Sequence, residues 1–271
     1  MVLNGELVKN SEARLLANSQ AIFFGWGLFE TVRVKNGRLC FFHRHIERMA
    51  SACRVLSMEF KMDVISLQDL CRRLVAANNL KDGALRITYC KESNGVYNTI
   101  VTTRENPYTE KHYIEGFRLV ISGIKRNQYS LMYRVKSTNY LENILARELA
   151  RRKGYNDCLF LNTSGHVCEC SISNIFWGKN DVIYTPAVEC GILPGITRSL
   201  IIEMSKRLGL RVATGRYNVE HLMKSQYVFV TNALAGIMPV SKINYTRFSV
   251  DSRIVKAIRE EYDKLLKAGK I

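Results

Sequence analysis

One segment of the sequence has the form of an anion-binding turn. In GILPGITRSLIIEM, residues 191–204, a turn at Pro194 and Gly195 leads into a helix that begins with Ile196 and Thr197. The first N–H groups of a helix have no partner within it, and the helix dipole adds partial positive charge there. The segment is therefore suited to hold a phosphate, although an ordinary turn into a helix has the same pattern.

Three charged residues elsewhere could carry chemistry. Lys136, in RVKSTNYLENIL, precedes a predicted helix, where partial burial would favour a neutral, nucleophilic amine. Glu169 lies in the apolar and small-residue stretch HVCECSISNIF, where a carboxylate is costly unless it is paired; a protonated pyridine nitrogen is one such partner. Arg48 follows His45 on a predicted amphipathic helix. Taken singly, these are one lysine among many, one buried glutamate and an arginine on a solvated face.

Together, the four features meet the needs of one cofactor. Pyridoxal phosphate requires a lysine for its Schiff base, an acid–base partner for its ring nitrogen and an anion site for its phosphate. Glu169 follows Lys136 by 33 residues, and Gly195 follows Glu169 by 26 residues. The combination predicts a pyridoxal-phosphate enzyme.

The chain resembles the class IV, or fold type IV, pyridoxal-phosphate enzymes, which include branched-chain aminotransferases, D-amino acid aminotransferases and 4-amino-4-deoxychorismate lyases. The resemblance runs nearly from end to end, and the order and spacing of its motifs make it specific. The motifs are FFGWGLFETVRV (23–34), HIERM (45–49), KSTNYL (136–141), ECSISNIFW (169–177), TPAVECGILPGITR (185–198) and TNALAGIMPV (231–240).

The resemblance implies a role for each matching residue. Lys136 would be the catalytic residue, as Schiff-base lysine and proton shuttle, and Glu169 would contact the pyridine nitrogen. The remaining cofactor contacts would be Arg48, Gly195, Ile196 and Thr197 at the phosphate, Leu193 against the ring and Tyr140 near the phenolic oxygen. The substrate contacts would be Phe29, Arg86, which matches a position that can meet a substrate carboxylate, and Thr231, Asn232 and Ala233.

Within this family, the chain looks most like the bacterial 4-amino-4-deoxychorismate lyases. Branched-chain aminotransferases usually read FEGIR early, place a tyrosine five residues after the lysine, and read SGTAAEI near the end. This chain has FETVR, Tyr140 four residues after Lys136, and TNALAGI from Thr231. Transamination of D-amino or branched-chain L-amino acids is the alternative activity. Trp26 departs from the aspartate common in the family's FGDG and bears on the entrance or the loop packing.

Composition narrows the class of protein. The chain has 271 residues and a net charge of +16, from 40 Lys and Arg against 24 Asp and Glu. Because the basic residues are spread as singles or pairs, the charge favours attraction of anionic small molecules over nucleic-acid binding. No apolar run is long enough to span a membrane, and the N-terminus lacks a secretory pattern. We expect a cytoplasmic enzyme and, by resemblance, a homodimer.

The eight cysteines do not form a metal or disulfide pattern. None has CxxC spacing, and Cys168 and Cys170 would point to opposite faces of a strand. Most lie in apolar runs, so we expect reduced, buried thiols and no metal site.

Hydrophobic periodicity predicts the elements that position these residues. Strands are expected at 28–34, 84–90, 117–123, 157–162, 172–177, 181–185 and 226–231. Helices are expected at 43–56, at 66–78 with Ser66 as N-cap, at 139–152 with one apolar face, from the Pro194–Gly195 turn, and at 251–267. Residues 91–115 lose periodicity and predict a loop or domain junction. The expected fold is α/β (α+β), of type IV. A smaller N-terminal α/β domain (1–114) and a larger barrel-like C-terminal domain (115–271), which binds pyridoxal phosphate, would flank a cleft.

Overall fold

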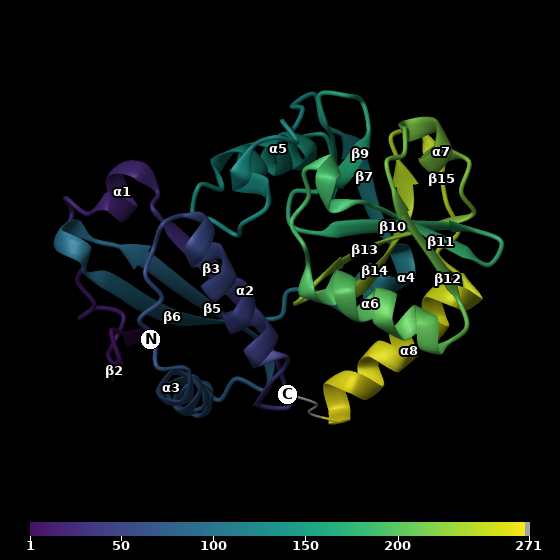
Figure 1. The fold of residues 1–271 in the computed structure, drawn as a ribbon. Helices are drawn as coiled ribbons and strands as arrows, with labels where there is room; N and C mark the ends of the chain where they lie inside the picture. The colour runs from purple at the N-terminus through teal and green to yellow at the C-terminus, as the bar shows by residue number, and fades with distance from the viewer. Residues whose placement is uncertain (269–271) are drawn as a thin grey trace. The chain divides into compact units, whose positions relative to one another are not determined.

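The computed structural model describes residues 1–268, which form two compact units (Figure 1). Unit 1 contains residues 1–107, 135–139 and 265–268; unit 2 contains residues 108–134 and 140–264. The short segment 135–139 assigns Lys136 to unit 1, although the residues on both sides of it belong to unit 2. The two domains expected from the sequence, divided after residue 114, stay a prediction.

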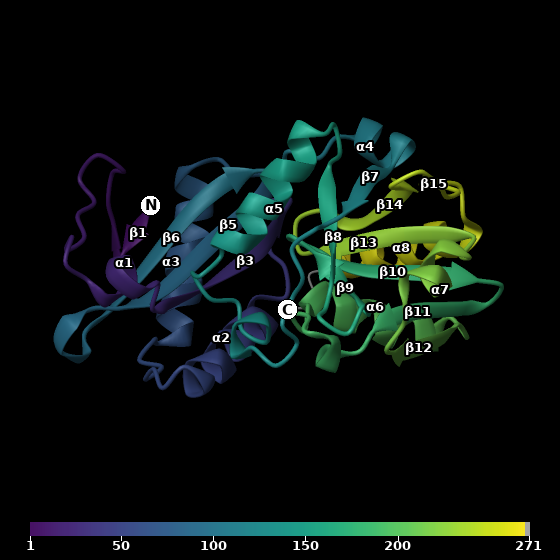
Figure 2. The same ribbon diagram turned by 90° about the horizontal axis from the view of Figure 1, so that it is seen from above.

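Unit 1 is built on a six-stranded antiparallel sheet of order β2-β1-β6-β5-β3-β4. Its elements are β1 Val2–Leu3, β2 Glu6–Leu7, α1 Gln20–Phe24, β3 Gly27–Lys35, β4 Arg38–Leu39, α2 Phe42–Val55, α3 Val64–Ala77, β5 Asp82–Lys91, the 3-10 turn η1 Ser93–Gly95 and β6 Tyr97–Glu105. Helix α2 packs against β3, and α3 packs against β1, β2 and β6 (Figure 2).

The strongly patterned parts of unit 1 fold as predicted. Strand β3 and its turn at Asn36–Gly37, where both residues have positive φ, form a hairpin with β4. Helix α2 buries Ile46, Met49 and Cys53. The predicted N-cap of α3 is wrong, however: Asp63, not Ser66, caps the helix, because its carboxylate accepts hydrogen bonds from the Ile65 and Ser66 N–H groups.

For residues 91–115 a loop or a domain junction was predicted: the loop is wrong, but the chain does pass from unit 1 to unit 2 here, between Pro107 and Tyr108. This stretch contains strand β6, paired with β5 from Lys91↔Tyr97 to Gly83↔Glu105, and the short helix α4, Glu110–Glu115, which begins unit 2. Strand β6 reads YNTIVTTRE and is only partly buried, so it lacks clean alternation of apolar and polar residues. Its stability comes from cross-strand pairing, which a single-segment pattern does not reveal.

Unit 2 is built on a nine-stranded mixed sheet of order β12-β11-β10-β13-β14-β7-β8-β9, with β15 paired to β14. Its strands are β7 Phe117–Ile121, β8 Asp157–Leu161, β9 Val167–Cys170, β10 Asn174–Lys179, β11 Val182–Pro186, β12 Arg211–Gly215, β13 Tyr227–Asn232, β14 Gly236–Ile243 and β15 Thr246–Arg247. The sheet curls until its last strand, β9, packs beside β10 and β11. Strands β9, β12 and β14 were not among those predicted.

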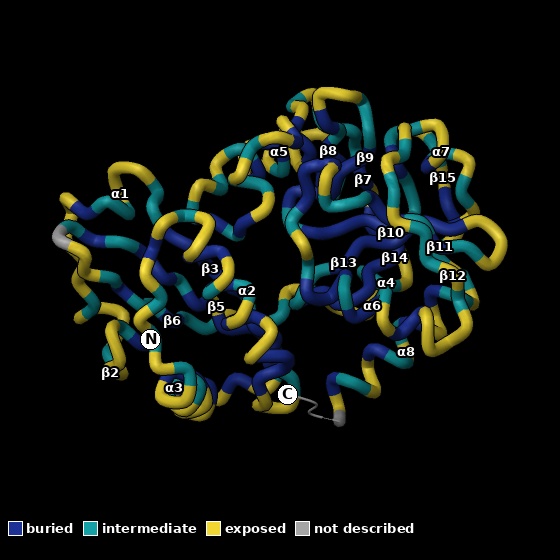
Figure 3. Tube along the Cα trace, viewed as in Figure 1, coloured by how far each residue is buried: buried dark blue, intermediate teal, exposed yellow. Residues whose placement is uncertain are grey.

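Helices surround this curled sheet. Besides α4 they are η2 Leu131–Tyr133, α5 Leu141–Arg152, η3 Val188–Cys190, α6 Ile196–Arg207, α7 Val219–Met223 and α8 Arg253–Ala268. Helix α5 packs against β8, and α6 packs against β12 and β13. The central strands β10, β13 and β14 are almost wholly buried (Figure 3) and carry much of the apolar core. This arrangement matches the predicted mixture of strands and helices.

Two further sequence expectations concern exposure. All eight cysteines are buried and none is in a disulfide, which confirms the prediction of buried thiols. Within residues 1–268, no helix is both long and apolar enough to cross a membrane.

Candidate active site

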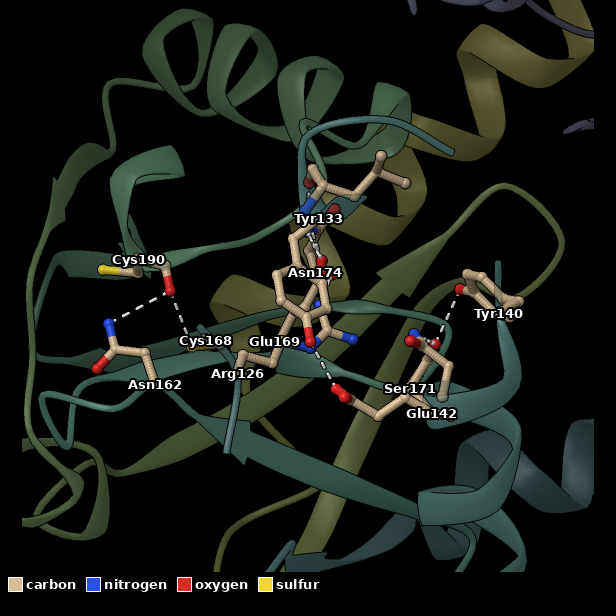
Figure 4. Close-up of polar contacts among 12 residues, drawn as sticks. Arg126, Tyr133, Tyr140, Glu142, Asn162, Cys168, Glu169, Ser171, Asn174 and Cys190 are labelled. Carbon is tan, nitrogen blue, oxygen red and sulfur yellow. Dashed lines mark hydrogen bonds and ion pairs between the residues drawn. The ribbon is translucent and has the colours of Figure 1, made fainter. Parts of the chain in front are cut away.

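Glu169, on β9, is the buried carboxylate around which polar groups of unit 2 gather (Figure 4). Its Oε1 accepts a hydrogen bond from Nη1 of Arg126 at 2.5 Å. Its Oε2 accepts from Nδ2 of Asn174 at 2.8 Å and from the Leu193 N–H at 3.2 Å. The cost expected for a lone buried carboxylate is thus offset by three donors on three segments.

Arg126 is a site residue that the sequence did not identify. Its side chain is buried, and its guanidinium carbon lies 4.2 Å from the ring centroid of Phe160 and 4.7 Å from that of Tyr133. Burial lowers the pKa of Arg126, but the charge and hydrogen bond of Glu169 outweigh it, so the pKa is raised. Its Nε and Nη2 have no hydrogen-bond partner among the described residues. Arg126 stands beside Lys125 in the stretch IKRNQ, and such a basic pair carries no pattern that would have singled it out.

Tyr140, expected near the cofactor's phenolic oxygen, precedes α5 and is tied to the turn between β9 and β10. Its hydroxyl donates to the main-chain oxygen of Ser171 at 2.9 Å, and Nδ2 of Asn143 donates to the same oxygen at 2.6 Å (Figure 4). The Ser171 hydroxyl donates in turn to Asp157 at 2.5 Å. Burial, with Glu169 next in effect, raises the pKa of Tyr140, so its hydroxyl stays protonated.

The predicted helix start after Pro194 is confirmed. Gly195 is the extended N-cap residue and α6 begins at Ile196, so the first N–H groups of α6 lack partners within the helix. Ile196 and Thr197 are buried. Nη2 of Arg198 donates to the main-chain oxygen of Pro186 at 2.9 Å and so braces the end of β11. Such a helix start presents main-chain donors suited to an anion.

The segment 231–233 is shaped by its asparagine. Oδ1 of Asn232 accepts from the Leu234 and Ala235 N–H groups at 2.9 and 2.7 Å, and its Nδ2 donates to the Ser173 hydroxyl at 2.9 Å. Asn232 therefore builds an Asx turn. The hydroxyl of Thr231 is buried and finds no hydrogen-bond partner in residues 1–268.

In unit 1, Arg48 is held by a buried glutamate that the sequence did not single out. Glu30 on β3 accepts from Nε and Nη2 of Arg48 at 2.7 and 2.6 Å, and Nδ1 of His45 lies 2.7 Å from its Oε2. Burial raises the pKa of Glu30, but Arg48 and His45 outweigh it and lower the pKa to about 2. Burial also lowers the pKa of His45, although Glu30 opposes this. Glu30 thus fixes the arginine expected at the phosphate.

Lys136 is positioned by backbone pairing with β3. The Phe29 N–H donates to the main-chain oxygen of Lys136, and the Thr138 N–H donates to that of Gly27, both at 2.8 Å. Nζ of Lys136 lies 4.4 Å from the centroid of the Phe29 ring, and the guanidinium carbon of Arg86 lies 3.9 Å from the same centroid. The predicted catalytic amine and the predicted carboxylate-binding arginine therefore share one aromatic ring.

Trp26, the departure from the family's aspartate, has a packing role in unit 1. Its indole N–H donates to the main-chain oxygen of Leu56, which ends α2, at 3.2 Å. Nζ of Lys91 lies 3.9 Å from the centroid of its ring. Trp26 therefore fastens the loop before β3 to the end of α2.

The predicted site residues divide between the units. Phe29, Arg48, Arg86 and Lys136 belong to unit 1; Tyr140, Glu169, Leu193, Gly195, Ile196, Thr197, Thr231, Asn232 and Ala233 belong to unit 2. Within unit 1, Phe29 brings Lys136 and Arg86 together; within unit 2, hydrogen bonds join Glu169 to Leu193. An ion-paired carboxylate, an unpartnered buried hydroxyl and a helix start fit a phosphorylated pyridine, but the individual roles stay predictions.

Comparison with known proteins places this arrangement in a family. The chain matches the profile described as Amino-transferase class IV over residues 27–243. It is 31% identical to the aminodeoxychorismate lyase of Bacillus subtilis (strain 168) in an alignment of 276 residues. This alignment covers 98% of this chain and 94% of the relative. It is 28% identical to a D-alanine aminotransferase of Listeria monocytogenes serotype 1/2a (strain 10403S) in an alignment of 259 residues. This second alignment covers 90% of this chain and 87% of the relative.

A solved structure gives the same picture. The T.th. branched-chain amino acid aminotransferase, solved with pyridoxamine 5′-phosphate, matches with a TM-score of 0.90 at 25% identity. The match covers 99% of this chain and 94% of that chain. The predicted fold type is therefore confirmed.

Proposed function

Because the chain belongs to the class IV aminotransferase family of pyridoxal-phosphate enzymes, we propose that it is a 4-amino-4-deoxychorismate lyase, which forms 4-aminobenzoate and pyruvate for folate synthesis. The observation that carries the proposal is the turn at Asn232, whose amide side chain closes the segment 231–235. Aminotransferases of the family place a serine–threonine pattern there around the substrate carboxylate. The likeness to the Bacillus subtilis lyase supports the same choice.

In this proposal, residues of the chain transfer one proton and stabilise the charge on the cofactor's ring nitrogen. Lys136 would hold the cofactor through its amine until the substrate amine takes its place, and the freed amine of Lys136 would then remove the proton from the substrate carbon that bears the amino group. Glu169, fixed by its three donors, holds the proton on the ring nitrogen. Pyridoxal phosphate, when bound, supplies the electron sink for this carbon. Loss of that proton and departure of the enolpyruvyl group, which takes up a proton to become pyruvate, leave the aromatic ring of 4-aminobenzoate.

Charge favours such a substrate. Aminodeoxychorismate carries two carboxylates, and the net charge of +16 attracts dianions at long range. Arg86, exposed at the Phe29 ring, is the residue we assign to one of the carboxylates. Its guanidinium can bind a carboxylate through two hydrogen bonds, which a lysine cannot do.

The direct test is formation of 4-aminobenzoate, followed by its fluorescence, when protein loaded with pyridoxal phosphate meets freshly generated aminodeoxychorismate. Robust turnover is the expected result. A loaded protein that binds the cofactor but releases no 4-aminobenzoate would refute the lyase proposal and leave the family assignment in place.

The alternative is transamination of D-amino or branched-chain L-amino acids, with a 2-oxo acid as acceptor. The likenesses to the D-alanine and branched-chain aminotransferases favour it. A screen of amino donors in both enantiomers, with 2-oxoglutarate and pyruvate as acceptors, distinguishes it from the lyase, because only transamination consumes the acceptor.

Arg126 gives a testable consequence of the role proposed for Glu169. Arg126→Lys keeps the positive charge but loses the planar guanidinium that packs on Phe160 and Tyr133 while donating to Glu169. We expect binding of pyridoxal phosphate about tenfold weaker, since cation–π contacts and charged hydrogen bonds are each worth on the order of 1–2 kcal/mol. Titration of the apoprotein by absorbance measures this. Unchanged affinity would remove Arg126 from the site.

We also propose a homodimer in which α5 contributes to the interface. The apolar face predicted for this helix points away from the core: Leu141, Ile144, Leu145 and Leu149 are 79%, 46%, 49% and 44% exposed. The buried residues of α5 are Asn143, Ala146 and Ala150. An exposed apolar stripe of this kind is typical of a protein–protein contact.

Leu145→Glu is therefore expected to convert the dimer to monomers, because a charge would be buried in an apolar interface. Light scattering after gel filtration reads the mass. Ile65→Glu is the matched control, because Ile65 is 81% exposed on α3. If Leu145→Glu keeps the mass of the wild type, α5 is not the interface.

We place the enzyme in the cytoplasm. All eight thiols are buried and unpaired, and burial raises the pKa of several of them, that of Cys71 to about 12. Free thiols are typical of reducing compartments, and protonated, buried ones are unreactive there.

A further inference from the structure

We infer that Asn174 is a positioning residue that fixes Glu169 relative to the turn before α6. The inference rests on the proposed roles of Glu169 at the ring nitrogen and of the 195–197 turn at the phosphate. Asn174 is the first residue of β10 and is buried. No role was predicted for it from the sequence, although it lies within the motif ECSISNIFW.

The amide of Asn174 links two segments that are distant in sequence. Its Nδ2 donates to Oε2 of Glu169 at 2.8 Å and to the main-chain oxygen of Leu193 at 2.9 Å (Figure 4). The Leu193 N–H donates to the same Oε2 at 3.2 Å. The carboxylate, the amide and the Leu193 main chain therefore form one closed network. If the carboxylate shifts, the turn must shift with it.

Packing at Gly195 fixes the other side of this network. A methyl group on Gly195 would overlap Oδ1 of Asn174. Gly195 has φ −70° and ψ 138°, a conformation open to any residue, so space and not backbone geometry requires glycine here. The N-cap of α6 thus rests directly on the amide that holds Glu169.

This contact gives Asn174 a function beyond stability. Glu169 and the start of α6 are proposed to hold opposite ends of one rigid cofactor, so their separation must match its length. Asn174 touches both segments and thereby sets that separation. Its main chain is held independently, by pairing of β10 with β13 at Asn174↔Thr231, so the strand does not depend on the amide.

The experiment compares two ligands on apoprotein: pyridoxal 5′-phosphate and pyridoxal, which lacks the phosphate. For Asn174→Ala we expect binding of pyridoxal 5′-phosphate to weaken about 10- to 100-fold, since one hydrogen bond to the charged Glu169 and one to the Leu193 main-chain oxygen are lost. Pyridoxal should weaken by a smaller factor, because it has no phosphate to misplace. Glu169→Gln should weaken both ligands by the same factor. Equal factors for Asn174→Ala would overturn the coupling of the two ends.

A second pair of variants tests the contact itself. Gly195→Ala should weaken binding of pyridoxal 5′-phosphate by a similar factor, because the new methyl group displaces Asn174. In the Asn174→Ala background the same methyl group has room, so the double variant should bind no worse than Asn174→Ala alone. Losses that multiply instead would mean that the two residues act separately.

Controls separate this inference from loss of folding and from failure of the proposed function. Asn98→Ala removes a comparable buried amide, whose Nδ2 donates to Glu92 in unit 1 at 2.5 Å, and should leave cofactor binding unchanged. Thermal melts of the apoproteins report folding. Wild-type protein that binds no pyridoxal 5′-phosphate would refute the cofactor role, whereas normal binding by a folded Asn174→Ala would refute only the positioning role.

Discussion

Lys136→Ala is expected to lower turnover by more than about 10³-fold and to remove the visible absorbance of the protein loaded with pyridoxal phosphate. The expected loss is this large because one amine is assigned both the bond to the cofactor and the proton transfer. The geometry favours this lysine: its main chain is paired to β3, and its amine lies at the ring that also carries Arg86. Absorbance spectra and 4-aminobenzoate fluorescence measure the two effects.

The chain offers a matched control for this variant. Nζ of Lys91 lies 3.9 Å from the centroid of the Trp26 ring, much as Lys136 lies against Phe29. Lys91→Ala removes a lysine–aromatic contact of unit 1 without touching the proposed site, and should keep both absorbance and turnover. If Lys136→Ala retained the absorbance, another lysine would bind the cofactor, and the assignment of the whole KSTNYL motif would fail.

The sequence predicted a feature correctly where the cause of that feature lies within a single segment. The Pro194–Gly195 turn predicts the start of α6 because a helix start depends on neighbouring residues alone. Glu169 stood out because an apolar stretch makes a carboxylate costly. The N-cap of α3 was mispredicted because Ser66 and Asp63 are both residue types that favour this position. The local sequence does not distinguish them, and only the hydrogen bonds in the folded helix show that Asp63 is the cap.

Partners that are distant in sequence were not predictable in this way. Arg126 is 43 residues from Glu169, and Glu30 is 18 residues from Arg48. Each is an ordinary charged residue in its own segment, and its role follows only from the strand pairing that buries it. Helix α5 shows a different limit of sequence reasoning. Its apolar residues Leu141, Ile144, Leu145 and Leu149 lie on one face, and such a face is usually buried. In the isolated chain, however, the opposite face packs on β8.

The ion pair of Glu30 leads to the second large prediction. Glu30→Gln is expected to lower the free energy of unfolding of unit 1 by about 3–5 kcal/mol at neutral pH, because it leaves Arg48 without its buried counter-charge. Urea unfolding of the apoprotein measures this. In a Trp177→Phe background the fluorescence comes from Trp26 alone, which lies in unit 1. Glu59→Gln is the control: Glu59 pairs with Lys61 at an exposed position of unit 1, where loss of the ion pair costs little stability.

The pH dependence of the same measurement distinguishes lost charge from lost packing. The pKa of Glu30 falls from 4.5 to about 2 on folding, so below pH 4.5 the unfolded chain takes up the proton first. The stabilisation by ionised Glu30, about 3 kcal/mol from the size of this shift, is present at neutral pH and is lost as pH falls from about 4.5 to about 2. Glu30→Gln lacks this contribution. The difference in unfolding free energy between wild type and variant should therefore shrink as pH falls through this range.

A difference that stayed constant with pH would mean that Glu30 acts through packing and not through its charge. Burial lowers the pKa of His45 and Glu30 opposes this, so Glu30→Gln also changes the titration of His45. The pH series is therefore run in a His45→Gln background, in which Glu30 is the titrating group of the pair. If the difference shrinks only below about pH 4.5, the charge of Glu30 holds Arg48 in place. The phosphate role proposed for Arg48 would then depend on a residue that never touches the cofactor.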